Sequence, residues 1–144
     1  VFTSDKDKNI LQSIDFLDLV QTDVKTISLE KSLENLIEYL SSSNQSIIPV
    51  LDEKNKMLGI IDFESIRPIV FNQYRVKFTM IKEIISQPKE VIHHDDGMET
   101  IMDKFENSNE TILPVTKYDK FFGLISKVEL LEAYREKLKE MVIE

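Results

Sequence analysis

Asn44-Gln45-Ser46-Ile47-Ile48-Pro49-Val50 is the stretch that decides the fold, because it returns without a gap as Asn109-Glu110-Thr111-Ile112-Leu113-Pro114-Val115. Around it, residues 20–71 as a whole reappear as residues 85–135, with one residue lost from the polar turn that follows the first stretch. Turns are where such deletions are tolerated. The chain is therefore an internal duplication, and its fold and function have to be argued from two copies of one pattern.

Hydrophobic periodicity predicts the same order of elements in each copy: strand, helix, strand, turn, strand, helix. In the first copy these are strand 24–27, a helix that Ser32 caps and that ends near residue 42, strands 46–51 and 56–61, and helix 63–71. In the second they are 91–93, 98–107, 111–116, 120–125 and a longer helix from residue 127 to about 141. The fold class is thus α/β, with two βαββα repeats. Because proline cannot donate to a strand ladder, Pro49 and Pro114 are expected to mark edge strands.

The expected domain organisation follows from these repeats. Residues 1–15 are expected to form a linker, 16–71 the first repeat, 72–78 a connector, and 79–144 the second repeat with its long C-terminal helix. Each repeat includes a short apolar approach segment before its first strand, residues 16–20 and 79–85. The apolar stripe of the last helix exceeds what one repeat should cover, which predicts docking onto another subunit; the alternative is that it only closes the core of its own chain.

Composition narrows the classes of function. A chain of 144 residues with 42% apolar content can bury one core, which the two repeats must share. It has no cysteine, which excludes disulfides and thiolate metal sites, and its net charge of −8 weighs against nucleic acid or an anionic lipid surface as the main partner. No apolar run approaches the roughly 20 residues that span a bilayer, so this segment is expected to be soluble. Because it starts at Val1, we expect it to be cut from a longer protein.

The sequence contains few residue patterns that would indicate catalysis or metal binding. The chain has three glycines and neither a glycine-rich phosphate loop nor a Ser, His and acid constellation, so we expect no enzymatic activity. His93-His94-Asp95-Asp96 is the one cluster of metal-ligand residue types. Consecutive strand residues point to opposite faces and do not chelate together easily, so no metal site is predicted.

The duplicated pattern resembles the CBS domain pair, or Bateman module, from about residue 16 to residue 141. The features that carry the resemblance are the Ile-Pro-Val and Leu-Pro-Val strands, each followed by a polar hairpin, a hydrophobic-Gly-hydrophobic-hydrophobic strand and a helix. Within that family the chain looks most like the cytoplasmic C-terminal module of bacterial ClC-type chloride channels and transporters, on the flanks 17–23, 62–67 and 126–135. The resemblance implies two pseudo-twofold-related repeats packed as one module. It also implies a homodimer, joined to the transmembrane channel domain of the same polypeptide at the cytoplasmic face of the inner membrane.

The resemblance further implies an adenine nucleotide, ATP, ADP or AMP, in the cleft between the repeats, with no other cofactor required. Ser126 would bond a phosphate and Glu129 would accept from the ribose hydroxyls, while the first repeat would contribute Val24, Thr26, Ile27, Gln45 and Ser46. The same positions in the first copy are Asp62 and Ser65, which put a carboxylate where a phosphate should sit, so that half-site is predicted not to bind. A ligand-free alternative is that Ser126 caps the following helix with Glu129 at its third position.

These observations favour a regulatory and dimerisation module of a membrane chloride channel or transporter, with the sensing of adenine nucleotide as the function that the resemblance implies. Two alternatives stay open at this level. The module could serve assembly without a ligand, or it could be an allosteric insert of a soluble enzyme or of another transporter.

Overall fold

The computed structural model describes residues 5–143, which divide into two compact units. Unit 1 contains the residues up to Thr22, 89–118 and those from Phe122 on, whereas unit 2 contains residues 23–88 and 119–121. Within residues 5–143, no helix is both long enough and apolar enough to cross a membrane.

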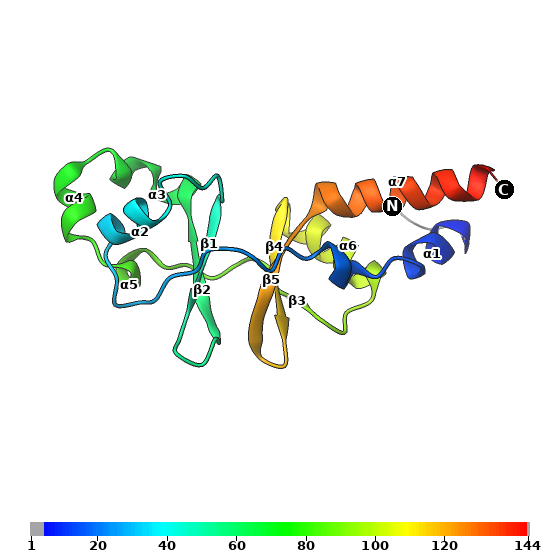
Figure 1. Cartoon of the computed structure of the whole chain (residues 1–144), viewed down its shortest axis with the longest axis horizontal. Coiled ribbons are helices and arrows are strands. Elements are labelled where there is room, and N and C mark those ends of the chain that lie inside the picture. Colours follow the sequence, from blue (N-terminus) through cyan, green and yellow to red (C-terminus); the bar gives the residue numbers. More distant parts are fainter. Residues whose placement is uncertain (1–4, 144) are drawn as a thin grey trace. The chain divides into compact units, whose positions relative to one another are not determined.

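Unit 2 is built on a two-stranded antiparallel ribbon. Strand β1 (Ile47–Leu51) pairs with β2 (Met57–Asp62), and Ile48 lies opposite Ile61. Helices α2 (Leu33–Tyr39), α3 (Phe63–Val70), α4 (Gln73–Phe78) and α5 (Ile81–Ile84) all lie on one side of this ribbon (Figure 1). The core between them is formed by buried aliphatic side chains, namely Ile27, Leu33, Leu36, Leu40, Ile48, Val50, Ile61, Ile66 and Ile81.

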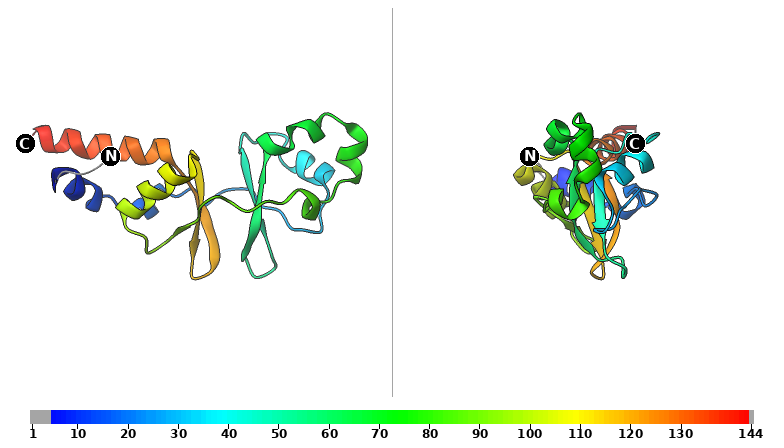
Figure 2. Two further views of the ribbon diagram at one scale, coloured as in Figure 1. Left: turned by 180° about the vertical axis from the view of Figure 1, so that it is seen from behind. Right: turned by 90° about the vertical axis from the view of Figure 1, so that its left-hand side faces the viewer.

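Unit 1 is built on a three-stranded sheet in the order β3-β4-β5. Strand β3 (Ile92–His93) runs parallel to β4 (Ile112–Lys117), and β5 (Lys120–Ser126) lies on the other side of β4. Helices α1 (Asp5–Gln12), α6 (Met98–Ser108) and α7 (Lys127–Ile143) lie on one side of the sheet (Figure 2), and the short 3-10 helix η1 (Phe16–Leu19) packs into the same core. That core includes Leu11, Phe16, Ile92, Ile101, Phe105, Leu113, Val115, Ile125 and Leu130.

The approach segments are exchanged between the two copies. Gln21, at the start of the first copy, exchanges two backbone hydrogen bonds of 2.8 and 3.0 Å with Leu124 of the second copy. Reciprocally, Ser86, at the start of the second copy, exchanges bonds of 2.8 and 2.9 Å with Ile60 of the first. Each compact unit therefore combines the strands and helices of one copy with the lead-in of the other.

The predicted repeats are confirmed as a mixed α/β fold with two βαββ-helix copies, and most element ends agree within two residues. Residues 5–12, expected as linker, instead form α1, because Ile10 and Leu11 are each only 1% exposed. Residues 73–78, expected as connector, form α4, which Asn72 caps. The predicted strand 24–27 is reduced to one parallel bridge between Ile27 and Val50. Residues 1–4 of the predicted linker lie outside the described part.

The expectation that both prolines mark edge strands is wrong. Strand β4, which contains Pro114, is the middle strand of its sheet. Strand β1, which contains Pro49, pairs with β2 on one side and bonds to Ile27 on the other. At Pro49 the side chain of Gln45 supplies a substitute hydrogen-bond donor.

A candidate ligand pocket in unit 2

A pocket with a volume of about 460 Å³ opens in unit 2 beside α2. Its walls come from the segment before α2, from α2 itself, and from the end of β1 with the turn that follows. The lining residues are Thr26, Ile27, Ser28, Lys31, Asn35, Tyr39, Leu51, Asp52 and Asn55. This lining combines an aromatic ring, a cation, a carboxylate and several amide and hydroxyl groups with two aliphatic side chains. Pockets of this size and mixture suit a small polar molecule with a flat apolar part.

Tyr39 provides the aromatic part of the pocket and is held by Lys25. The Lys25 ammonium lies 4.7 Å from the centroid of the Tyr39 ring. The same Nζ donates a hydrogen bond of 2.9 Å to the Tyr39 carbonyl oxygen. A cation over an aromatic face is attractive, so the two contacts together fix the last turn of α2 and its ring against residue 25. The Tyr39 side chain nevertheless stays 46% exposed and accessible to a ligand.

Two opposite charges line the same pocket. Lys31 is exposed, and its ammonium makes no hydrogen bond or ion pair within residues 5–143. Asp52 accepts hydrogen bonds from the backbone N–H groups of Lys54 (2.8 Å) and Lys56 (2.9 Å). These bonds, that from Lys56 foremost, lower the pKa of Asp52 below the usual carboxyl range. The pocket therefore offers a free cation for an anionic group and an ionised carboxylate for hydroxyl or amine donors.

Beside the pocket, the charge of Lys31 also acts on Glu30. Hydrogen bonds from its own backbone N–H and from Ser28 lower the pKa of Glu30, with a smaller contribution from the positive charge of Lys31. Ser28 and Lys31 both line the pocket, whereas Glu30 does not. The ionised Glu30 carboxylate thus neighbours Lys31 in the chain but lies outside the pocket lining, in which Lys31 is the cation.

Gln45 lies outside the pocket lining and positions the segment that forms one wall. Its Oε1 accepts from the Lys25 N–H (3.0 Å), and its Nε2 donates to the carbonyl oxygens of Lys25 (2.8 Å) and Ile47 (3.0 Å). Pro49 accepts from the Ile27 N–H, so a regular parallel ladder would have residue 49 donate to the Lys25 carbonyl. Proline lacks that N–H, and the Gln45 amide supplies the missing donor.

The structure separates the predicted contacts of the first repeat. Thr26 and Ile27 line the pocket, whereas Val24, Gln45 and Ser46 do not. Ser46 is exposed, and its carbonyl oxygen accepts from the N–H of Phe63 at the start of α3 (3.2 Å). Lys31 and Tyr39 were not predicted as site residues. A signal for them exists in the sequence, because Lys31, Asn35 and Tyr39 follow each other at four-residue spacing, with Lys31 just before the Ser32 cap of the predicted helix.

Ser126 and Glu129 lie in unit 1, at the junction of β5 and α7. Ser126 is half-buried, and its Oγ accepts from the Glu129 N–H at 3.5 Å, the outer limit of a hydrogen bond. Lys127 donates its N–H to the Thr111 carbonyl oxygen (2.8 Å), which ties the start of α7 to the strand beside it. Within the described residues the exposed Glu129 carboxylate forms no hydrogen bond or ion pair. The ligand-free capping box is therefore only half formed, and the carboxylate stays available.

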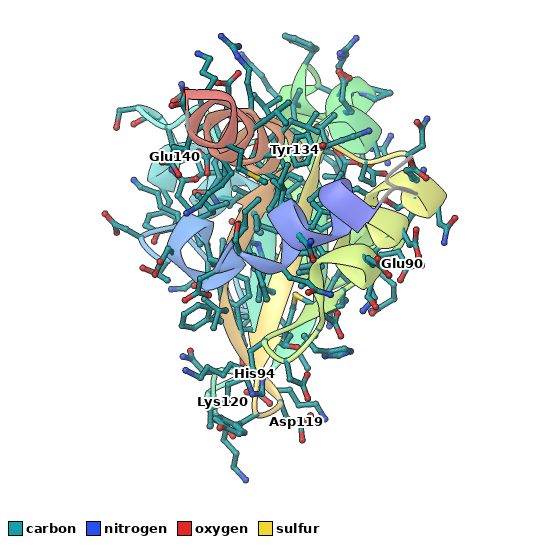
Figure 3. All side chains as sticks on the ribbon, turned by 90° about the vertical axis from the view of Figure 1, so that its right-hand side faces the viewer. Glu90, His94, Asp119, Lys120, Tyr134 and Glu140 are labelled. Carbon is teal, nitrogen blue, oxygen red and sulfur yellow. The ribbon has the colours of Figure 1, made fainter. Side chains whose placement is uncertain are left out.

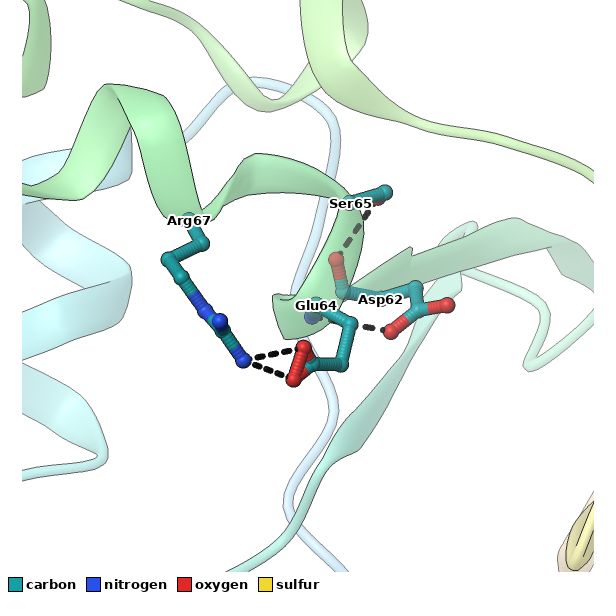
Figure 4. Close-up of polar contacts among 4 residues, drawn as sticks. All are labelled: Asp62, Glu64, Ser65 and Arg67. Atoms are coloured by element: carbon teal, nitrogen blue, oxygen red, sulfur yellow. Dashed lines mark hydrogen bonds and ion pairs between the residues drawn. The ribbon is translucent and has the colours of Figure 1, made fainter.

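The corresponding residues of the first copy are occupied within α3 (Figure 4). The Asp62 carboxylate accepts from the Glu64 N–H (3.0 Å), and the Ser65 hydroxyl donates to the Asp62 carbonyl oxygen (2.8 Å). The Arg67 guanidinium pairs with both carboxylate oxygens of Glu64. Asp62 thus serves as the N-cap of α3, a role that requires no ligand.

The histidine and aspartate cluster of the second copy is spread over separate contacts. His93 Nδ1 lies 3.0 Å from the Thr116 hydroxyl, and the His94 ring packs on Tyr118 at 4.6 Å between centroids. Figure 3 shows His94 toward the β4–β5 turn, whereas Tyr134 lies on α7 at the other end of unit 1. Asp96 pairs with Lys104 at 2.7 Å. Burial acts to raise the pKa of Asp96, but hydrogen bonds from Lys104 and the His93 N–H outweigh it and lower the pKa. No group of three or more potential ligands among residues 5–143 could hold a metal ion.

Comparison with known proteins places this chain among duplicated regulatory modules. The family described as "CBS domain" matches residues 17–71 and 81–136. A curated homoserine O-acetyltransferase from Methanosalsum zhilinae is 26% identical over 121 residues, which cover 83% of this chain and 24% of that protein. The chain spans about a quarter of the length of the curated relatives it matches.

Solved structures share the fold at low sequence identity. A CBS domain-containing protein of unknown function from Bacillus anthracis has a TM-score of 0.79 at 21% identity, covering 90% of this chain and 99% of that one. The CBS domain of a bacterial CNNM/CorC family Mg²⁺ transporter in complex with ATP has a TM-score of 0.73 at 14% identity, covering 87% and 89%. CbpB in complex with c-di-AMP has a TM-score of 0.75 at 20% identity, covering 94% and 93%.

Proposed function

The chain belongs to the CBS domain family, and we propose that it is a regulatory module that binds an adenine nucleotide. The observation that carries this proposal is the pocket of about 460 Å³ in unit 2, which is lined by Thr26 and Ile27, two of the contacts expected from the family pattern. Relatives of the same fold have been solved with ATP and with c-di-AMP, which supports an adenine nucleotide as the ligand class. A CBS pair regulates and does not catalyse, so no reaction is assigned to these residues.

The proposed contacts follow from the chemistry of each side chain. The base packs on Tyr39 and the aliphatic wall, where a flat ring finds an aromatic face. Lys31 contacts the phosphate, because it is the pocket's unpaired cation among the described residues. Ser126 and Glu129 remain the proposed contacts to phosphate and ribose that the family pattern implies, and Val24, Gln45 and Ser46 are proposed to act on the ligand through the position of segment 24–27.

The mechanism is a shift between conformations of the protein that carries this module. A nucleotide changes that equilibrium only by as much as its affinities for the two conformations differ. A nucleotide bound in the pocket would favour the conformation that holds Lys31, Tyr39 and Asp52 around it. That preference is the regulatory signal that we propose.

Isothermal titration of this chain with ATP, ADP, AMP and c-di-AMP tests the proposal. We expect saturable binding of at least one of them, weakened at least about tenfold by Lys31→Ala, since hydrogen bonds to charged groups contribute about 1.5–3 kcal/mol. Glu129→Gln should weaken a nucleotide with free ribose hydroxyls. Lys82→Ala and Glu106→Gln are matched controls, because both residues are exposed and lie outside the pocket. If none of the four nucleotides gives a binding signal, nucleotide binding is contradicted and a ligand-free assembly module is favoured.

The parent of the module is a separate proposal. The flanks 17–23, 62–67 and 126–135 favour a ClC-type chloride channel or transporter, in which the chain would form a homodimer at the cytoplasmic face of the inner membrane below the transmembrane domain of the same polypeptide. An insert in a soluble enzyme or in another transporter is the alternative. Sequencing the parent gene decides between them, because a ClC-type parent must contain many apolar runs of roughly 20 residues.

A further inference from the structure

A cluster of exposed aromatic side chains lies at the end of α3 and on α4 in unit 2. Phe71, Tyr74 and Phe78 are 84%, 73% and 61% exposed. The Tyr74 and Phe78 rings touch at 4.7 Å between centroids, as residues four apart on a helix do. Single exposed apolar residues are ordinary, but three large aromatic side chains within eight residues form a patch that marks an interaction surface.

The same part of the chain is positively charged, whereas the chain as a whole is negatively charged. Residues 65–82 contain no Asp or Glu but four cations, Arg67, Arg75, Lys77 and Lys82, and the rest of the chain holds the other 14 basic residues with all 26 acidic ones, a net charge of −12. Arg67 pairs with Glu64, whereas Arg75 and Lys77 form no ion pair within residues 5–143. Salt limits the reach of exposed charges to about 8 Å, so a partner at α4 meets this local positive charge and little of the overall −8.

Helical geometry arranges the aromatic and basic side chains of α4 on one surface, and Phe71 lies two residues before this helix. At 100° per residue, Tyr74 and Phe78 share one side of α4, with Arg75 and Lys77 on its two flanks and Val76 on the opposite side. Val76 is half-buried and packs against the unit 2 core, so the aromatic side of α4 faces away from that core. Lys77 Nζ lies 5.8 Å from the Phe78 ring. We call Phe71, Tyr74, Arg75, Lys77 and Phe78 the aromatic-basic surface.

A second copy of the chain is a poor occupant for this surface. A twofold dimer centred on this surface would bring Arg75 and Lys77 of both copies into one interface, and residues 65–82 offer no acidic side chain to pair with them. A head-to-tail contact with an acidic face would avoid that repulsion, but it would give a ring only at particular rotations and an open filament at all others. A stripe of aromatic residues with cations on both flanks is instead the pattern of helices that lie in a membrane interface, with the rings among the headgroups and the cations on anionic lipids.

We propose that the aromatic-basic surface binds an anionic lipid bilayer, with Phe71, Tyr74 and Phe78 in the headgroup region and Arg75 and Lys77 on lipid phosphates. The binding is peripheral, because α4 has only six residues. It would orient unit 2 on a membrane whichever parent carries the module. The inference does not rest on nucleotide binding or on a transporter parent.

Tryptophan fluorescence on vesicles tests the proposal, because the chain has no tryptophan of its own. Tyr74→Trp is titrated with vesicles of phosphatidylcholine alone and with about 30% phosphatidylglycerol. We expect a blue-shifted emission with the anionic vesicles and at least about tenfold weaker partitioning on the neutral ones or when Arg75 and Lys77 are both changed to Gln. Raising the salt to about 0.5 M should weaken the shift as well.

Controls separate lipid binding from misfolding and from other partners. Tyr118→Trp, at a tyrosine that is 76% exposed, should show no shift, and Val128→Ser with Leu131→Ser should leave vesicle flotation unchanged. Phe71→Ser with Phe78→Ser should abolish flotation while circular dichroism stays native. An unchanged Tyr74→Trp emission, an equal shift at Tyr118→Trp, or a dimer in solution that is lost with Phe71→Ser and Phe78→Ser in the absence of vesicle binding would overturn the proposal.

Discussion

At the scale of single residues, Gln45 shows how a side chain can complete a backbone ladder. It makes three hydrogen bonds, two to Lys25 and one to the Ile47 carbonyl oxygen. Two of these bonds are donated, and one of them replaces the N–H that Pro49 lacks. The pocket wall formed by Thr26 and Ile27 is continuous with Lys25, so the position of the wall depends on the Gln45 amide.

Gln45→Glu is expected to lower the free energy of unfolding by about 1–3 kcal/mol, because it removes both donors and leaves two carbonyl oxygens facing a carboxylate. The measurement is urea unfolding followed by circular dichroism. Gln73→Glu is the matched control, since residue 73 is exposed at the start of α4, and it should change stability by less than about 0.5 kcal/mol. Equal stabilities of the two variants would show that the Gln45 amide does not support the strand.

The sequence predicts the position of a residue such as Gln45 relative to the strands, but it does not predict the hydrogen-bond partners of its side chain. Register with the second copy correctly places Gln45 just before a buried strand, and family resemblance then makes it a ligand contact. In the structure the amide bonds to the backbone, because segment 24–27 lies beside β1 and Pro49 lacks the N–H that this pairing needs. A direct contact of Gln45 with a ligand stays a prediction. Lys31, Asn35 and Tyr39 share a four-residue spacing, but that spacing alone does not place them in a pocket, because the other walls come from residues 26–28 and from the end of β1 with its turn.

At the scale of elements, the two strand glycines are explained by the exchanged lead-in segments. A Cβ at Gly59 would lie 2.6 Å from the Ser86 carbonyl oxygen, and one at Gly123 would lie 2.4 Å from the Gln21 carbonyl oxygen. Both obstacles are backbone atoms that cannot rotate away. The glycines are needed because the lead-in segment of the other copy approaches closely. They are not needed for their backbone angles, since neither has a positive φ.

Gly59→Ala and Gly123→Ala are each expected to destabilise the protein by about 1–3 kcal/mol, as overpacking does. Gly97→Ala is the matched control, because a Cβ there meets nothing within 4 Å, and it should stay within about 0.5 kcal/mol of the original protein. Thermal unfolding of the three variants at one pH provides the comparison. If Gly97→Ala loses as much stability as the other two variants, close contact with the lead-in segments is not the cause.

Periodicity recovers the elements that bury a regular apolar face and misses those that do not. The apolar stripes predict helices α2, α6 and α7. Ser32 marks the start of α2, and the neighbouring predicted strands limit α6 and α7. Helix α1 was missed because its charged first half hides a short buried pair, Ile10 and Leu11. Helix α4 was missed because its aromatic residues face outward, so its apolar pattern does not report a core.

At the scale of the whole molecule, the exchanged lead-ins mean that neither sequence copy contains a complete core. Leu11 and Phe16 precede the first copy and are buried in the core of unit 1 with Ile92, Phe105 and Val115. Ile81 precedes the second copy and is buried in the core of unit 2. The duplication is visible in the sequence, but the exchange is not, because aligned repeats have the same pattern whether each lead-in packs on its own copy or on the other.

Deleting residues 1–22 should therefore unfold unit 1, which lies mostly in the second copy, and spare unit 2, which follows the deletion directly. The deletion removes Leu11, Phe16 and the Gln21 pairing with Leu124, and a buried phenylalanine alone contributes about 3–5 kcal/mol. Hydrogen exchange measured by mass spectrometry should show lost protection in β4 and α6 and retained protection in β1 and β2. Phe16→Ala should weaken the same elements in the intact chain. If protection is instead lost in β1 and β2, the lead-in packs on the copy that follows it and the exchange is refuted.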